Sequence, residues 1–418
     1  MSDRSRRRVA VVGGMRTPFV KAGTAFTQYS ALDLGVHAVK GLIDRLAIEP
    51  ETVEELVHGT VIPNPFVSNI AREIVFELGL PNSIHAYSLS NNCITGIHTV
   101  TAVANSIALG NIEVGIAGGA ESMSNPPVSF GKEMSRIVLD AWSAKTASRR
   151  ISTLLKVRPR HFKPVTPAVA ERSTGLSMGE HTELTAKEWK IPRQEQDEIA
   201  YHSHMNAHRA NEAGLLQREI HPLDGIDRDP IIRPDTSLER LAKLPPVFDR
   251  SPAGTLTAGN SSPLTDGASA VLLMSEERVE REGREPLAFV RAVEYAAIDP
   301  DDGLLMGPAV AVPRVLTKAR LTLADMGIIE MHEAFGAQVA ANLQAWKQGW
   351  KEPAIGEVNR EILNPLGSSI AVGHPFAATG GRIVTTLANQ MKRNGTKYGL
   401  ISICAAGAMA AAMILERA

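Results

Sequence analysis

Residues 88–118 read SLSNNCITGIHTVTAVANSIALGNIEVGIAG, which is a polar loop, an apolar run with helical spacing and a short strand-like run. Serine and asparagine are helix-capping residues, so the pattern predicts a helix over Ile94–Leu109 with Cys93 in its first turn. A strand is predicted over Val114–Gly118. This loop–helix–strand unit is typical of an α/β fold.

Part of the same unit recurs near the C-terminus. Residues 384–389 (VTTLAN) match residues 100–105 (VTAVAN) at four of six positions. Each segment lies in a predicted helix that follows a distinctive loop, around His374 and around Cys93, and leads to a strand. The recurrence predicts a duplicated α/β unit, with Cys93 and His374 near equivalent helix N-termini.

Outside these segments, apolar runs that favour strands alternate with amphipathic runs that favour helices, such as Ala31–Leu46. The further strand-like runs are residues 9–13, 56–62, 268–274, 287–293, 327–331 and 399–404. This alternation indicates a parallel α/β sheet covered on both faces. Over residues 126–249 the strand pattern stops while proline, charge and histidine increase, which predicts an inserted, largely helical loop domain.

The composition is that of an ordinary globular chain. Its 418 residues are 44% hydrophobic and 21% charged, with a formal net charge of -1. This length suggests two or three domains. The balanced charge gives no basis for binding nucleic acid, which usually requires a strongly basic face. Two cysteines cannot form a disulfide framework, so we expect a reducing compartment and a cytoplasmic location.

Two segments raise the question of a membrane or targeting signal. The uncharged run 399–415 is shorter than the about 20 residues of a spanning helix and contains glycine, so a strand, a turn and a second strand are predicted there. The basic residues at 4–8 precede an apolar stretch that is too short for a secretory signal. We expect no transmembrane segment.

Two cysteines are candidate reactive thiols. At the predicted helix start, free backbone N–H groups and the helix dipole favour the thiolate of Cys93, since the pKa of a free cysteine is about 8.5. Cys404 follows a strand-like run and precedes small residues, so that another group can approach it closely. The carboxyl ends of strands are where α/β sheets bind ligands. Taken alone, each cysteine is more commonly a buried core residue.

Two histidines occupy comparable positions. His374 lies in the loop AVGHPFAATGGR, where Pro375 and the glycines restrict the backbone, and a histidine held in this way suits a general base. His332 and Glu333 follow a predicted strand and precede a predicted helix. A satisfied loop histidine explains either position alone. The coincidence of two cysteines and two histidines at loop and strand-end positions favours a shared site.

Three other patterns carry weaker signals. His202, His204 and His208 have metal-like spacing, but their polar neighbours favour a solvated helix face, so no metal site is predicted. The loop after the first strand lacks G-x-G-x-x-G, which disfavours a dinucleotide-dependent dehydrogenase. Residues 145–163 gather seven lysines and arginines without an acid, a patch that suits phosphates, anionic lipid or an acidic partner, and equally a solvated surface.

In combination, these blocks resemble the thiolase family over almost the whole chain. The matching motifs are residues 15–19 (MRTPF), Cys93 before its helix, 117–123 (AGGAESM), 256–268 (LTAGNSSPLTDGA), 332–335 (HEAF), 373–375 (GHP) and Cys404. His332 stands where most thiolases have asparagine. The HEAF motif, with residues 69–74 and 167–179, is similar to the β subunit of the fatty-acid oxidation trifunctional complex and its bacterial relatives.

The resemblance implies a five-layered α/β/α/β/α core of two similar halves. The N-terminal half would comprise residues 1–125 plus 250–283, and the C-terminal half residues 284–418. The inserted loop domain, residues 126–249, would cover coenzyme A. Coenzyme A is then a substrate, and neither a permanently bound cofactor nor a metal is expected.

The resemblance also implies a mechanism, in which coenzyme A cleaves a 3-ketoacyl-CoA through an acyl-enzyme. His374 would deprotonate Cys93, whose thiolate attacks the 3-keto carbon. Cys404 would protonate the departing enolate of acetyl-CoA and then activate the second coenzyme A. One oxyanion hole would be formed by the backbone N–H groups of Cys93 and Ala406, and another by His374 with His332.

Further residues match positions with a binding role in relatives. Ser262 and Met178 match positions that line the pantetheine tunnel, Ala334 and Phe335 lie beside the thioester, and Glu333 orders its loop.

One departure concerns the segment after the second cysteine. Most thiolases have a glycine-rich run there, whereas residues 405–410 read AAGAMA. The methyl groups of Ala408 and Ala410 can narrow the site or shift the backbone, which leaves the acyl-chain length and the rate open.

The resemblance implies a homodimer or larger homo-oligomer, with a hydratase/dehydrogenase α subunit as a candidate partner. Two other functions stay open. A condensing enzyme is compatible with Cys93, His332 and His374, although decarboxylative condensation needs no second thiol such as Cys404. A non-catalytic acyl-CoA-binding subunit is the alternative from a different class.

Overall fold

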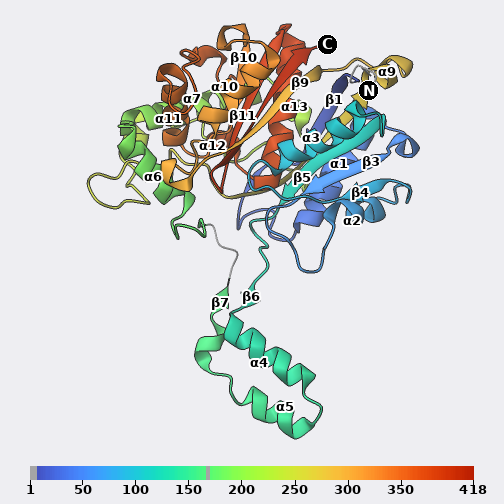
Figure 1. Cartoon of the computed structure of the whole chain (residues 1–418), viewed down its shortest axis with the longest axis vertical. Coiled ribbons are helices and arrows are strands. Elements are labelled where there is room, and N and C mark those ends of the chain that lie inside the picture. Colours follow the sequence, from blue (N-terminus) through green and yellow to red (C-terminus); the bar gives the residue numbers. More distant parts are fainter. Residues whose placement is uncertain (1–6, 166–169) are drawn as a thin grey trace. The chain divides into compact units, whose positions relative to one another are not determined.

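A computed structural model of the chain describes residues 7–165 and 170–418, so positions 4–6 of the basic N-terminus and the first residues of the 167–179 motif lie outside the described residues. The main sheet has ten strands in the order β10-β11-β12-β9-β1-β8-β5-β3-β4, with β2 pairing with β8 off this path (Figure 1). They are β1 (Val9–Arg16), β2 (Val20–Lys21), β3 (Glu55–Gly59), β4 (His85–Tyr87), β5 (Val114–Glu121), β8 (Thr265–Ser275), β9 (Ala288–Ala297), β10 (Ile328–Met331), β11 (Tyr398–Ala405) and β12 (Met409–Arg417).

The sheet is mixed, so the prediction of a parallel sheet is wrong for its middle. The pairs β10–β11, β3–β4 and β3–β5 are parallel, whereas β11–β12, β12–β9, β9–β1, β1–β8 and β8–β5 are antiparallel. Hydrophobic alternation does not encode strand direction. Between β11 and β12 only residues 406–408 intervene, and so short a connection permits only an antiparallel pair. The uncharged run 399–415 is therefore a strand, a turn and a strand, as predicted.

Two halves of the sheet repeat one order of elements, which confirms the duplication. The first half runs β1, α1 (Ala31–Leu46), β3, α2 (Ile70–Glu77), α3 (Thr95–Ala108), β5, β8. The second runs β9, α10 (Pro308–Ala319), β10, α11 (Gly336–Gln348), α13 (Thr379–Asn394), β11, β12, with the short α12 (Ser369–Val372) before α13. The halves join where Ala10 and Val11 of β1 pair with β9.

The helices form three layers around the two halves. In β1, a Cβ added to Gly13 would meet Leu46 at the end of α1, whereas one added to Gly14 would meet Thr385 of α13, so these helices cover opposite faces. Along β12, Ala412 packs in a cluster with residues of α10, and the next residue, Met413, packs in a cluster with residues of α3 and α13. Helices α3 and α13 therefore lie between the halves (Figure 1), and the predicted α/β/α/β/α fold is confirmed.

The two central helices cross at glycines. A Cβ on Gly96 of α3 would lie 2.5 Å from the carbonyl oxygen of Ala377, and a Cβ on Gly380 of α13 would lie 2.1 Å from the backbone nitrogen of Ile97. No larger residue fits at this separation. The crossing therefore brings the N-terminal ends of α3 and α13 together, with the segments that precede them.

Residues 62–68 and the described part of 126–169 form a second compact unit, separate from the unit that contains the sheet. It holds α4 (Lys132–Ser143), α5 (Ala147–Leu154) and the two-stranded sheet of β6 (Ser129–Phe130) and β7 (Pro164–Val165). All seven basic residues of the 145–163 patch are exposed there. The unit with the sheet includes α6 (Met178–Glu188), α7 (Arg193–Glu212), α8 (Leu238–Ala242) and α9 (Glu276–Arg281).

Among the described residues, no helix combines the length and the apolar character that crossing a membrane requires.

Candidate active site

Cys93 lies just before α3 in a turn held by side-chain hydrogen bonds. The Thr95 hydroxyl accepts a bond from the Asn91 backbone N–H at 2.8 Å and donates to the Asn92 carbonyl at 2.7 Å. Asn92 has a left-handed φ of 47°, and its side-chain amide donates to the Ala406 carbonyl at 3.0 Å. The turn of Cys93 is therefore fastened to the turn between β11 and β12.

The predicted stabilisation of the Cys93 thiolate is wrong for the free protein. Burial raises the pKa of Cys93 to about 11, and hydrogen bonds from the backbone of Ala406 and of Cys93 itself only partly oppose this shift. The charge of Glu121 raises the pKa further. Removing the thiolate from water thus outweighs the backbone donors at the helix start. Cys93 is a neutral thiol at pH 7 and needs a base before it can attack.

Cys404 lies near the end of β11 and is only 1% exposed. Burial raises its pKa well above the ordinary value, and the charge of Cys93 adds to the shift. The hydrogen bond from Asn92 to the Ala406 carbonyl joins the turn of Cys93 to the turn just after Cys404, although the two cysteines come from different halves of the fold. At neutral pH Cys404 carries its proton, which is the state required of an acid.

The rings of His374 and His332 contact each other in the interior, with their centroids 4.0 Å apart and their planes tilted by 41°. The His374 backbone N–H donates to Thr265 Oγ1 at 2.8 Å, and the His332 backbone N–H donates to the Ser402 carbonyl at 2.8 Å. Burial lowers the pKa of His374 to about 3 and lowers that of His332 well below the ordinary value. Both Nε2 atoms are buried without a hydrogen-bond partner in the described part of the chain, so both are available to a substrate.

The His374 loop reaches the Cys93 turn through two contacts. One is the glycine crossing of α3 and α13. The other is Glu121, whose carboxylate accepts a hydrogen bond from the Ala377 backbone N–H at 3.4 Å and whose charge also acts on Cys93. The structure thus brings both predicted cysteines and both predicted histidines into one region.

The predicted binding residues gather at Cys404. Met178 at the start of α6 packs in one apolar cluster with Cys404, Ala334 and Phe335. The Ser262 backbone N–H donates to the Ala334 carbonyl at 2.9 Å, which places the segment of residues 260–262 alongside this cluster. Ala406, the remaining predicted residue, lies in the turn that contacts Cys93.

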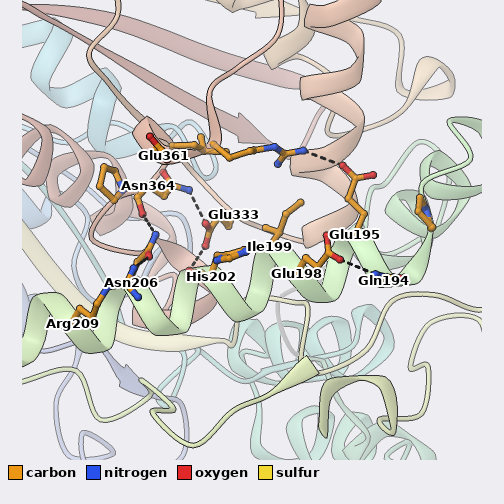
Figure 2. A pocket seen from close by; sticks show the side chains of 15 residues that line it. Gln194, Glu195, Glu198, Ile199, His202, Asn206, Arg209, Glu333, Glu361 and Asn364 are labelled. Atoms are coloured by element: carbon orange, nitrogen blue, oxygen red, sulfur yellow. Dashed lines mark hydrogen bonds and ion pairs between the residues drawn. The ribbon is translucent and has the colours of Figure 1, made fainter. Parts of the chain in front are cut away.

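Glu333 was predicted to order its own loop, and its hydrogen bonds join that loop to α7, to Asn364 and to the start of α12. Its carboxylate accepts hydrogen bonds from the Ser203 hydroxyl at 2.6 Å, the Asn364 amide at 2.6 Å and the Ile370 backbone N–H at 3.3 Å. Figure 2 shows Glu333 and Asn364 hydrogen-bonded to α7 in the lining of a cleft of about 810 Å³. The cleft lies beside the loop before α12, which supports His332, and the two cysteines lie outside its lining.

The interpretation of the α7 histidines as a solvated face is wrong for His204. This residue is buried, its Nδ1 accepts a hydrogen bond from the Arg233 backbone N–H at 3.2 Å, and burial lowers its pKa to about 4. Asp197 of the same helix is buried as well and accepts hydrogen bonds from Asn260 and Arg193. A polar helix face is tolerated in the interior because its groups have partners. In the described residues no group of side chains is arranged to hold a metal ion.

The two unusual alanines after Cys404 are accommodated in different ways. Ala408 adopts a left-handed φ of 55°, a conformation that favours glycine. Ala410 pairs with Cys404 across β11 and β12 and faces Gly307, where an added Cβ would approach the Ala410 methyl to 2.9 Å. The extra methyl groups therefore require a strained turn and a glycine opposite.

Sequence reasoning missed the residues that hydrogen-bond the histidine rings. Ser369 Oγ lies 2.7 Å from His332 Nδ1 and 3.1 Å from an Arg382 nitrogen, and Thr379 Oγ1 lies 2.6 Å from His374 Nδ1. A signal existed only for Arg382, which is a charged residue in an otherwise apolar and small-residue stretch after the His374 loop. The hydroxyl residues give no such signal.

Comparisons with known proteins agree with this geometry. The chain matches the model of the thiolase N-terminal domain over residues 9–277 and that of the thiolase C-terminal domain over residues 284–417. It is 45% identical to the 3-ketoacyl-CoA thiolase of Serratia proteamaculans (strain 568), over 98% of this chain and 97% of that protein. It is 44% identical to the 3-ketoacyl-CoA thiolase of Shewanella frigidimarina (strain NCIMB 400), over 100% of both.

Solved structures with the same fold include a Bacillus anthracis acetyl-CoA acetyltransferase, with a TM-score of 0.86, 29% identity and 99% of both chains covered. Human mitochondrial 3-ketoacyl-CoA thiolase in complex with CoA has a TM-score of 0.84 and 29% identity, over 99% of this chain and 98% of that one. Both halves of the chain thus match the same family in sequence and in structure, and the chain belongs to the thiolase family.

Proposed function

We propose that this chain is a 3-ketoacyl-CoA thiolase, an acyltransferase that cleaves 3-ketoacyl-CoA with coenzyme A to acetyl-CoA and a shortened acyl-CoA during β-oxidation of fatty acids or related acids. The observation that carries the proposal is that the turn of Cys93 is hydrogen-bonded, through Asn92, to the turn that follows Cys404, in the region of two neutral histidines whose rings contact each other. Thiolysis requires a nucleophile and a separate acid–base of this kind. The names of the similar bacterial proteins support the substrate class.

In the first half-reaction, His374 accepts the Cys93 proton while the sulfur attacks the 3-keto carbon. With a His374 pKa of about 3 and a Cys93 pKa of about 11, both groups are neutral beforehand, so the proton moves as the carbon–sulfur bond forms. Collapse of the adduct breaks the carbon–carbon bond and leaves the shortened acyl group on Cys93. The enolate of acetyl-CoA takes its proton from Cys404.

In the second half-reaction, the Cys404 thiolate accepts the thiol proton of an incoming coenzyme A. The coenzyme A sulfur attacks the acyl carbon, and the Cys93 thiolate leaves and recovers its proton from His374. Both cysteines and His374 return to their starting protonation states, so the cycle is balanced.

Negative charge develops on two oxygens during these steps. We assign one to the backbone N–H groups of Cys93 and Ala406, because these groups already bond the Cys93 sulfur. We assign the other to Nε2 of His332 and, once His374 has taken the Cys93 proton, to Nε2 of His374, and the protein leaves both atoms without partners in its described part. Loss of one such donor costs about 3 kcal/mol in a transition state.

Coenzyme A is the second substrate, and the proposal needs no permanently bound cofactor. We place its pantetheine arm along Ser262 and Met178, with the thioester beside Ala334 and Phe335, because Met178, Ala334 and Phe335 belong to the apolar cluster of Cys404 and Ser262 is hydrogen-bonded to Ala334. We retain a domain division into residues 1–125 plus 250–283, 126–249 and 284–418. Met178 lies in the 126–249 segment, which supports a role of that segment in covering the substrate.

We further propose that the chain works in the cytoplasm as a homodimer or larger oligomer, with a hydratase/dehydrogenase α subunit as partner. Both cysteines are free thiols, as suits a reducing compartment. The surface of the second compact unit supports the binding of another protein chain, because it exposes large apolar side chains next to its basic residues. Examples are Trp142 (85% exposed), Leu155 (72% exposed) and Leu139 (63% exposed).

Thiolysis of a ladder of 3-ketoacyl-CoA esters, followed as loss of the enolate absorbance, tests the proposed function. We expect turnover with the wild-type chain and a loss of at least about a hundredfold in Cys404→Ala, which lacks the acid–base. Full turnover of Cys404→Ala would favour a condensing enzyme. Absence of turnover in the wild type, with acyl-CoA still bound, would favour a non-catalytic binding subunit.

A further inference from the structure

The adjacent rings of His332 and His374 are held at Nδ1 by hydroxyl groups whose own surroundings differ. His332 Nδ1 lies 2.7 Å from Ser369 Oγ, and His374 Nδ1 lies 2.6 Å from Thr379 Oγ1. A hydroxyl can donate or accept, and a neutral imidazole carries its proton on one nitrogen only. The remaining partner of each hydroxyl therefore decides which nitrogen of the ring is protonated.

On the His332 side, the remaining partner is a cation. A nitrogen of Arg382 donates to Ser369 Oγ at 3.1 Å and to Ser368 Oγ at 3.3 Å. A guanidinium only donates, so Ser369 must accept this bond. Within the described residues the Ser369 hydroxyl contacts no acceptor except His332, so its proton points to Nδ1. The His332 proton then resides on Nε2.

On the His374 side, the remaining partner is a carbonyl. Thr379 Oγ1 lies 3.2 Å from the Pro375 carbonyl oxygen, which can only accept. The threonine proton goes to this carbonyl, and Thr379 Oγ1 accepts from His374 Nδ1. His374 Nε2 is then unprotonated and carries a free lone pair.

We propose that Arg382 and Ser369 are positioning residues that hold His332 as its Nε2–H tautomer, while Thr379 holds His374 as its Nδ1–H tautomer. This proposal rests on the proposed function and deepens it. Of two adjacent imidazoles, His332 donates a hydrogen bond to the oxyanion and His374 accepts the proton of Cys93. The division of labour is set by Arg382, Ser369 and Thr379, none of which needs to touch the substrate.

The burial of Arg382 supports this role. The side chain is 2% exposed, its nearest carboxylate oxygen, on Glu330, lies 3.7 Å away, and its Nε has no partner in the described residues. A buried cation with so loose an ion pair is poor for stability. The positioning of a catalytic ring gives this buried cation a role other than stability, and its charge also opposes protonation of His332.

Two pairs of variants separate positioning from general structural damage. We expect Ser369→Ala to lower kcat of thiolysis by about tenfold to about a hundredfold at similar KM, because one oxyanion donor is no longer fixed. Iodoacetamide alkylation of its Cys93 should keep the wild-type rate. Thr379→Val should instead slow this alkylation by about tenfold or more, because His374 loses its fixed base form. Ser369→Thr and Thr379→Ser, which keep the hydroxyl, should restore each readout.

The proposal is overturned if Ser369→Ala keeps its kcat within about threefold of the wild-type value. It is also overturned if Ser369→Ala and Thr379→Val each lower both the kcat of thiolysis and the alkylation rate of Cys93. Nitrogen-15 NMR of the wild-type chain with labelled histidine provides a measurement that needs no variant at Ser369. We expect the ring signal that is lost in His332→Asn to be that of an Nε2–H tautomer, and the ring signal that is lost in His374→Asn to be that of an Nδ1–H tautomer. Two identical tautomers contradict the inference. Opposite tautomers in a chain without thiolysis would leave the inference standing and the proposed function failing.

Discussion

Burial determines the protonation states in this site. A cysteine at a helix N-terminus ordinarily has a lowered pKa, yet the pKa of Cys93 is raised to about 11 because the thiolate would lose more hydration than two backbone N–H groups replace. The pKa of His374 is lowered to about 3 for the same reason. At neutral pH the pair is therefore a thiol and an imidazole, which avoids a permanently reactive thiolate.

The pH dependence of alkylation tests this pair. Cys93 is uncharged below its raised pKa, and its thiolate fraction grows tenfold per pH unit up to about 11. Above the pH-independent alkylation by iodoacetamide that His374 assists, we expect a thiolate component of the Cys93 rate that rises throughout from about pH 7 to about pH 10, whereas the rate of the unfolded chain should level off above about pH 9. A plateau of the folded chain below about pH 8 would show that the thiolate is stabilised instead.

At the same scale, the sequence predicted Cys93, Cys404, His332 and His374 because each follows a loop or strand pattern and a family motif. It could not predict the partners of the histidine rings, since Ser369 approaches His332 only after α12 folds back on β10. The raised pKa of Cys93 could not be predicted from the sequence either, because burial depends on every element packed around this residue.

The turn at Ala408, in a conformation that favours glycine, gives a stability prediction. Ala408 holds a left-handed φ of 55°, which costs about 1 kcal/mol in any residue except glycine. We expect Ala408→Gly to raise the free energy of unfolding by about 0.5 kcal/mol after the entropy of the unfolded glycine is deducted, as measured by urea denaturation. Ala412→Gly, within β12, should be destabilising and serves as the control. Equal effects of the two substitutions would refute the interpretation of strain at residue 408.

Among the elements, helix α1 illustrates what local patterns determine. Its predicted span Ala31–Leu46 is the observed one, because Ser30 forms a capping box with Asp33 and the apolar residues recur on one side. Strand direction was predictable only for the tight turn between β11 and β12, because elsewhere an apolar run reads alike in parallel and antiparallel sheets. In helix α7 the local pattern predicts the wrong environment. Its polar residues Asp197 and His204 are buried against partners far along the chain.

The crossing of α3 and α13 is the contact between elements on which the site depends most. A Cβ at position 380 would lie 2.1 Å from the Ile97 backbone nitrogen, and backbone cannot move aside as a flexible side chain does. We expect Gly380→Ala to lower the free energy of unfolding by about 2 kcal/mol or more and to lower kcat, as measured by urea denaturation and thiolysis.

Lys392→Ala is the matched control on the exposed side of the same helix, where an ion pair with Glu285 is solvated. It should change the stability by less than about 0.5 kcal/mol. A Gly380→Ala chain as stable as this control would mean that the helices can separate without loss.

At the scale of the whole molecule, duplication explains why one site draws on distant segments. Each half contributes a central helix, and the residues before the two helices supply Cys93 and His374. The second half adds Cys404 and His332 at the ends of neighbouring strands β11 and β10. A fold built from one half alone would lack either the nucleophile or its base.

The oligomeric state is a prediction for the whole molecule. The exposed apolar side chains of the second compact unit favour association, since a monomer rarely exposes so many. We expect light scattering coupled to size exclusion to give a particle of at least twice the chain mass of 44.9 kDa. A particle of single-chain mass at micromolar concentration would refute the proposed homo-oligomer.

The central claim is that Cys93 carries the acyl group between the two half-reactions. Incubation with a 3-ketoacyl-CoA in the absence of free coenzyme A, followed by acid quenching, digestion and mass spectrometry, tests it most directly. We predict one equivalent of acetyl-CoA released and the acyl group, shortened by two carbons, on the peptide that contains Cys93. Release of acetyl-CoA with Cys93 unmodified, or the acyl group on Cys404, would contradict the account.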